Sequence, residues 1–146
     1  MTLHKTKKQL KKYLQQQEGV VFAYLFGSAL KHNRYRDIDV GIYMRDGIDL
    51  LDLGGMQTEL NDKFEDSVDL IPINNLPVKK PVLAFNIAVK GELLFTTDVD
   101  LQVEYKKKAM LQYYDTAPLR EMMNEAFDER LQAGKFGERD FSLEDH

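Results

Sequence analysis

Apolar and polar residues follow one another in blocks along the chain, and each block predicts one element. Residues 3–17 carry a narrow apolar stripe at helical spacing, which predicts a helix that stops near Gly19. Residues 20–26 are apolar without interruption and include β-branched and aromatic side chains, so we expect a strand buried on both faces. Residues 37–43 alternate between apolar and polar positions, which predicts a strand with one apolar and one acidic face.

The same reasoning continues to residue 131. We expect a helix over 52–64, a strand over 68–71 closed by Pro72, a helix over 78–90 and a strand over 92–96. Asp98 is a good N-cap for a long amphipathic helix, which carries Val99, Val103, Met110 and Tyr114 on one side. Residues 115–118 interrupt that helix, and a last helix follows over 118–131.

These elements predict one α+β domain over residues 1–146. Its length fits a single domain with a substantial core. We expect the core over about residues 3–96, a helical C-terminal extension over about 98–133, and a polar, mobile tail over 134–146.

Composition removes several classes of chemistry. The chain has no cysteine and three histidines that lie far apart in sequence, so thiolate chemistry and a histidine-rich metal site are not expected. It has 24 acidic residues, and these are the remaining candidates for holding a metal. The lack of cysteine is consistent with the cytoplasm, and neither a membrane span nor a signal peptide is recognisable.

Charge is distributed unevenly. Residues 1–13 contain five lysines and no acid, whereas residues 120–146 contain four basic and eight acidic residues. The net charge of −4 thus belongs to the C-terminal segment, and the rest of the chain is neutral overall. A neutral body argues against a dedicated nucleic-acid-binding protein, which usually has a basic face.

Three aspartates form the candidate catalytic and metal-binding set. Asp37 and Asp39 lie two positions apart on a predicted strand, so their side chains point to the same face. Asp69 lies on the following predicted strand, and neighbouring strands are only about 4.8 Å apart. Ligands that supply only oxygen suit Mg²⁺ or Mn²⁺, and such a carboxylate cluster can support displacement at phosphorus.

Gly27 and Ser28 are the candidate phosphate-binding residues. They follow the buried strand directly, where a glycine lets the backbone approach a phosphate closely. Ser28 adds a hydroxyl and a backbone N–H. A Gly-Ser pair alone is usually only a turn. The order of strand, Gly-Ser, Asp-x-Asp strand, helix and Asp-bearing strand is much more specific.

At these residues the sequence resembles the minimal nucleotidyltransferases of the DNA polymerase β-like superfamily. Their Gly-Ser, Asp-x-Asp and later Asp correspond to Gly27-Ser28, Asp37-Ile38-Asp39 and Asp69, within about residues 20–73. The resemblance implies the nucleotidyltransferase fold, a small mixed β-sheet flanked by helices, with long C-terminal helices. Residues 113–120 also look like one branch, the MntA-type adenylyltransferase antitoxins, which are paired with HEPN-domain RNase toxins.

The resemblance implies a protein adenylyltransferase that uses Mg²⁺ or Mn²⁺ and transfers AMP from ATP to a tyrosine of a HEPN-type toxin. Eight residues separate Ser28 from Asp37, fewer than is common in this branch, and the connection lacks its usual glycine. Lys31, Arg34 and Arg36 in that connection either contact phosphates or are surface charges.

Two alternatives remain open. One is a degenerate transferase that neutralises its toxin by binding alone, with Met122, Met123 and Phe127 on its last helix. The other is a transferase that modifies a small-molecule hydroxyl.

Overall fold

The computed structural model describes residues 3–27, 37–64 and 67–132 of the 146-residue chain, and the side chains of residues 4–126 within these ranges. The predicted mobile tail, Ser28, Lys31, Arg34, Arg36 and the side chain of Phe127 therefore lie outside the described part. The elements, in chain order, are α1 (Leu3–Gln15), β1 (Val20–Phe26), β2 (Asp37–Met44), α2 (Leu50–Lys63), β3 (Ser67–Pro72), α3 (Leu76–Lys79), α4 (Pro81–Ala88), β4 (Glu92–Thr96), α5 (Val99–Asp115) and α6 (Ala117–Gln132). Each predicted strand is present.

The four strands form one mixed sheet in the order β3-β2-β1-β4. β1 pairs antiparallel with both β2 and β4, whereas β2 and β3 are parallel and are joined through α2. Every residue of β1 is buried, because β1 has a neighbour on each side and helices on both faces. The prediction of a small mixed sheet flanked by helices is confirmed.

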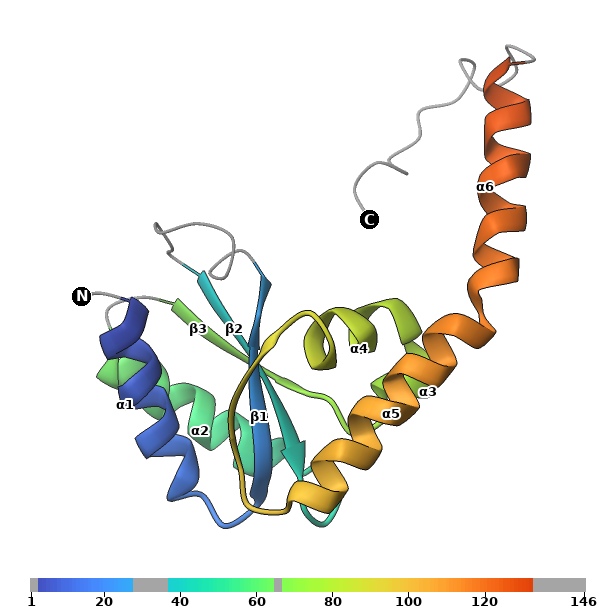
Figure 1. Ribbon diagram of the computed structural model, residues 1–146. Coiled ribbons are helices and arrows are strands. Elements are labelled where there is room, and N and C mark those ends of the chain that lie inside the picture. Colours follow the sequence, from blue (N-terminus) through green and yellow to red (C-terminus); the bar gives the residue numbers. More distant parts are fainter. Residues whose placement is uncertain (1–2, 28–36, 65–66, 133–146) are drawn as a thin grey trace. The chain divides into compact units, whose positions relative to one another are not determined.

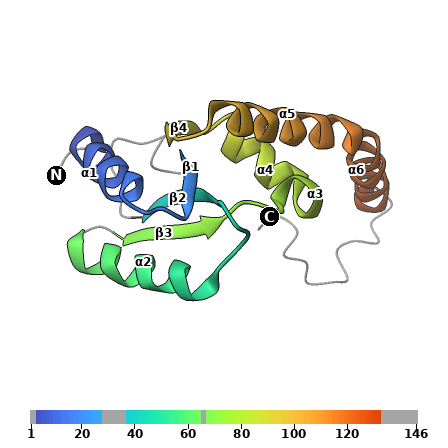
Figure 2. The same ribbon diagram turned by 90° about the horizontal axis from the view of Figure 1, so that it is seen from below.

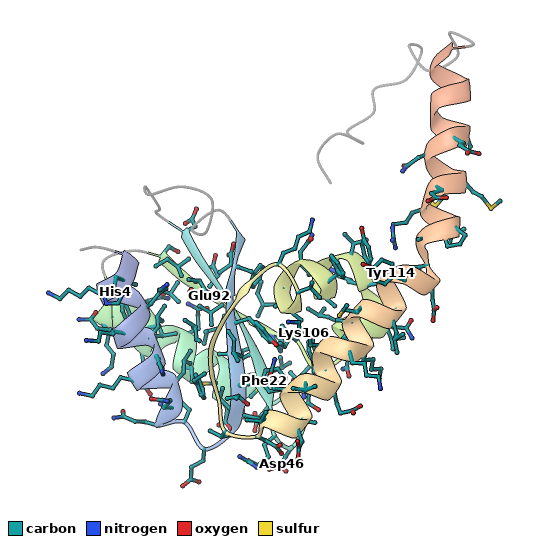
Figure 3. All side chains as sticks on the ribbon, viewed as in Figure 1. His4, Phe22, Asp46, Glu92, Lys106 and Tyr114 are labelled. Atoms are coloured by element: carbon teal, nitrogen blue, oxygen red, sulfur yellow. The ribbon has the colours of Figure 1, made fainter. Side chains whose placement is uncertain are left out.

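Helices cover both faces of the sheet, as Figures 1 and 2 show for α1 and α2 on one face and α4 and α5 on the other. The first face is covered by a core cluster that includes Leu10, Leu14 and Leu60. The second face is covered by a cluster that includes Phe22, Ile87 and other apolar side chains. In Figure 3, Phe22 points from β1 towards α5. The sheet is thus the middle layer of a three-layer arrangement.

One predicted helix is interrupted. The pattern over 78–90 predicted a single helix, but the structure has two, α3 and α4, which meet at Lys80. Pro81 has no backbone N–H and disfavours the helical conformation of the residue before it, and Lys80 has φ −140° and ψ 75°. Pro81 then serves as the first residue of α4, a position that tolerates proline.

The apolar side of α5 does not face the core. Val99 and Val103 are 62% and 51% exposed, whereas the buried residues of the helix include Gln102 and Tyr105. The buried side chains satisfy their polar atoms internally: the Gln102 amide donates to the Tyr24 hydroxyl, and the Tyr105 hydroxyl donates to the backbone oxygen of Ile73 at 2.6 Å. A reading of hydrophobicity alone therefore selected the wrong side of this helix.

The chain divides into two compact units, Met1–Tyr113 and Tyr114–His146. The first unit contains the sheet. The described part of the second contains α6, on which Leu119, Met122 and Met123 are exposed. Among the described residues, no helix has the length and apolar character needed to cross a membrane.

Candidate functional site

Asp39 and Asp69 are direct neighbours across the two parallel strands. The register pairs Asp39 of β2 with Asp69 of β3, and it pairs Asp37 with Ser67. Asp37 and Asp39 share one face of β2 because side chains alternate along a strand. The strands therefore bring together the three aspartates that the sequence singled out.

The pKa of the Asp39 carboxyl is raised by this arrangement. Burial raises the pKa of the Asp39 carboxyl above its usual value of 3.8, and the charges of Asp69 and then Asp37 raise it further. Asp37 and Asp69 are exposed, whereas Asp39 is half-buried. A carboxylate that is partly desolvated beside two like charges is stabilised by a nearby cation.

Gly27 lies directly against the Asp39 carboxylate. It follows β1, whose last residue Phe26 pairs with Asp39, and its φ of +85° is in the left-handed region that favours glycine. A Cβ atom at this position would lie 2.5 Å from Asp39 Oδ2, far inside van der Waals contact. Glycine is therefore favoured here by its backbone conformation, and it leaves the Asp39 carboxylate in the space that a Cβ atom would take. Ser28, the predicted phosphate-binding partner of Gly27, lies outside the described residues.

The donor set fits a hard divalent cation in its chemistry. All three side chains offer carboxylate oxygens, which Mg²⁺ and Mn²⁺ prefer. Across the described ranges, no three acidic, histidine or cysteine side chains stand as a group that could already hold a metal ion. The strands place the three carboxylates on the same face of the sheet. Because these carboxylates repel one another, their side chains would have to turn towards a cation in order to hold it.

Sequence reasoning missed Gln57, which contacts the backbone on both sides of Asp69. Its amide donates to the backbone oxygen of Val68 and accepts from the backbone N–H of Leu70 at 2.9 Å. A signal was present in the sequence: Gln57 is a polar residue between Met56 and Leu60, which face the core from α2. A long amide at that position can reach the neighbouring strand.

Two hollows lie at the end of the sheet that is farthest from the three aspartates. They have volumes of about 510 and about 490 Å³ and share Gly19 and Met44 among their lining residues. Val20 pairs with Met44 at this end, whereas Phe26 pairs with Asp39 at the opposite end. Asp46, which lines the larger hollow, marks this end of the sheet in Figure 3. The three aspartates are thus well separated from both hollows.

Comparison with protein families gives one match over most of the chain. The family model described as polymerase beta, nucleotidyltransferase, matches residues 8–100. This range begins in α1 and ends in α5, so it contains the whole sheet together with Gly27 and the three aspartates. A comparison with curated protein sequences finds no match.

Several solved structures have a similar fold. The tri-AMPylated Shewanella oneidensis HEPN toxin in complex with MNT antitoxin contains a chain that is 21% identical, with a TM-score of 0.65. The match covers 85% of this chain and 98% of that one. The toxin–antitoxin MntA–HepT gives 19% identity and a TM-score of 0.64, with 85% and 98% covered. A toxin–antitoxin with AMP-PNP gives 20% identity and a TM-score of 0.65, with 86% and 99% covered.

Proposed function

This chain belongs to the polymerase beta nucleotidyltransferase family, and on that premise we propose that it is an antitoxin that transfers AMP from ATP to a tyrosine of a HEPN-type toxin. Three observations on similar folds support the choice of partner and donor. One similar structure holds a tri-AMPylated HEPN toxin with its MNT antitoxin, a second is the toxin–antitoxin MntA–HepT, and a third contains AMP-PNP, an ATP analogue.

The observation that carries the proposal is the pairing of Asp39 with Asp69 beside Gly27. These residues bring carboxylates to the end of β1 at which the Gly27 backbone, with no side chain in the way, can be approached closely. We propose that Gly27 and Ser28 position the β- and γ-phosphates, and that Asp37, Asp39 and Asp69 would hold Mg²⁺ or Mn²⁺. When bound, such a cation would offset the negative charge of the triphosphate and make the phosphorus under attack more electrophilic.

The exposed carboxylate of Asp69 has a separate role in the transfer. It accepts the proton of the acceptor hydroxyl, whose oxygen then forms a bond to the α-phosphorus of ATP. The bond between the α-phosphorus and the oxygen that bridges it to the β-phosphorus breaks, and pyrophosphate leaves. Asp37 and Asp39 would orient the triphosphate through the cation that they hold, while Asp69 acts on the acceptor.

The deciding experiment uses ATP labelled on the α-phosphate, Mg²⁺, the full chain and the HEPN-type protein encoded beside it. We expect label on a tyrosine of that partner, and we expect Asp39→Ala to abolish labelling without loss of the folded state. Asp46→Ala is the matched control, because it removes an exposed aspartate that follows β2 at the opposite end of the sheet. This control variant should label the partner as the unmodified chain does.

Other results would assign a different function. A tight complex without label, together with toxin neutralisation that survives Asp39→Ala, would refute transfer and indicate neutralisation by binding alone. Label on a small-molecule hydroxyl in place of the partner would refute the choice of acceptor.

A further inference from the structure

β3 is an edge strand, and its outer side would otherwise present unpaired backbone groups next to Asp69. Within the part of the chain that the structure describes, the sheet order places β2 on one side of β3 and no strand on the other. Successive residues of a strand turn their backbone polar groups to opposite sides, so Val68 and Leu70 present theirs to the same side. Unpaired groups at a sheet edge are free to shift or to pair elsewhere.

The side chain of Gln57 pairs with these groups. The amide of Gln57 donates through Nε2 to the backbone oxygen of Val68 and accepts through Oε1 from the backbone N–H of Leu70 at 2.9 Å. One planar amide thus makes the pair of hydrogen bonds that a further strand would make. It does so on the two residues that flank Asp69.

The helix that carries Gln57 is itself firmly seated. Met56 and Leu60 of α2 are buried in the core on that face of the sheet. The helix begins at an N-cap, Asp49, whose carboxylate accepts from the backbone N–H groups of Leu51 and Asp52. Gln57 therefore holds β3 from a helix that the core already fixes, and side chains with few free rotamers position a site best.

We propose that Gln57 is a positioning residue for Asp69: by pairing with Val68 and Leu70, it fixes the strand segment from which the Asp69 carboxylate acts on the metal and the acceptor hydroxyl. This proposal rests on the proposed function. Gln57 contacts no substrate in it, and its effect reaches the reaction only through the backbone around Asp69. Groups that hydrogen-bond directly to a metal ligand typically contribute about 10–100-fold to metal affinity or activity, and Gln57 acts one step further out, through the backbone, so we expect an effect near the lower end of that range.

The chain offers a matched control at the other end of the same pair of strands. The side-chain amide of Asn74 accepts from the backbone N–H of Met44 at 2.9 Å and donates to the backbone oxygen of Met44 at 2.8 Å. Asn74 thus makes the same kind of pair as Gln57. It does so at the end of β2 farthest from the aspartates.

The test compares Gln57→Met with Asn74→Leu in the full chain. Each variant replaces a side-chain amide by an apolar side chain of similar size, and each loses two hydrogen bonds to the backbone. We expect both to lower Tm, but only Gln57→Met to weaken the binding of Mn²⁺ alone, by about ten-fold or more in calorimetric titration. Amide hydrogen exchange at Leu70 should accelerate in Gln57→Met only. A third variant, Asn61→Ala, removes the remaining contact of the Gln57 amide and should leave Mn²⁺ binding unchanged.

Kinetics add a second comparison, because AMP transfer should fall in kcat by about ten-fold or more in Gln57→Met, with little change in KM for ATP. If Gln57→Met does not fold, Gln57→Glu serves instead, because its carboxylate keeps the acceptor for Leu70 and loses the donor to Val68. It should show a smaller loss in the same direction.

Mn²⁺ affinity that is unchanged in Gln57→Met, or reduced equally in Asn74→Leu, overturns the proposal. The same holds if the unmodified chain binds no Mn²⁺. Because Mn²⁺ binding and hydrogen exchange need neither ATP nor a partner, the role of Gln57 is decided even if no AMP is transferred. In that case only the proposed function fails.

Discussion

Replacing Gly27 by alanine perturbs the backbone and the Asp39 carboxylate at once, and the two effects can be separated. The φ of +85° disfavours any residue with a Cβ, at a cost of about 1–2 kcal/mol. In a protein of this length, 1 kcal/mol corresponds to about 2–4 °C in Tm. Gly27→Ala is therefore expected to lower Tm by about 2–8 °C.

The second effect acts on the site. The new Cβ would lie 2.5 Å from Asp39 Oδ2, whereas ordinary contact begins at 3.4 Å. The carboxylate must therefore move by about 0.9 Å, the difference between those distances. The movement costs little stability because the end of a side chain can rotate. A misplacement of about 1 Å at a reacting group is worth about 100-fold in rate, so we expect AMP transfer to fall by about that factor.

Gly47→Ala isolates the backbone effect. Gly47 has a φ of +89°, and no described residue lies within 4 Å of the Cβ that would be added there. Thermal unfolding followed by circular dichroism should show similar losses of Tm in both variants. Initial rates of AMP transfer, measured well below both Tm values, should fall only in Gly27→Ala. Equal rates in the two variants would refute the argument that Gly27 makes room for Asp39.

Three further predictions concern stability. Asp39→Asn should raise Tm at pH 7 in metal-free buffer, because the raised pKa of Asp39 means that its ionised form destabilises the folded state; the gain should disappear as the pH falls towards 3.8, and a gain that persists there would contradict this reasoning. Tyr105→Phe should cost about 0.5–1.5 kcal/mol in urea unfolding, because one hydrogen bond to the buried backbone oxygen of Ile73 is lost while the backbone N–H of Leu76 still donates to that oxygen. Gly91→Ala should destabilise by about 1–3 kcal/mol, since its Cβ would lie 2.2 Å from the Ile87 backbone oxygen. Gly54→Ala, inside α2, should instead stabilise by about 0.5–1 kcal/mol, because the structure describes no atom within 4 Å of the added Cβ.

The sequence predicted which side chains share a face of a strand better than it predicted which residues of neighbouring strands pair with each other. The alternation over 37–43 correctly indicated that Asp37 and Asp39 share a face, because side-chain direction along a strand is a local property. Nothing local determines that Asp69 lies opposite Asp39. That register depends on where α2 returns the chain to the sheet.

Polar residues with long apolar parts explain why the buried side of α5 and the role of Gln57 were not predicted. Tyr105 and Gln102 are buried because their polar atoms find partners in Ile73, which follows β3, and in Tyr24 of β1. Gln57 has the same character, since its role depends on the edge of β3. Hydrophobic periodicity cannot identify such residues, because their burial is decided by tertiary hydrogen bonds.

The central position of β1 has a consequence for synthesis of the protein. β1 ends at Phe26, but the strand that covers its second edge, β4, begins only at Glu92. A nascent chain that has emerged through β3 can pair β1 with β2 while the other edge of β1 stays open. That edge belongs to seven consecutive apolar residues without a charge, the kind of segment that pairs with other chains. Aggregation during translation should therefore depend on how soon residues 92–96 leave the ribosome.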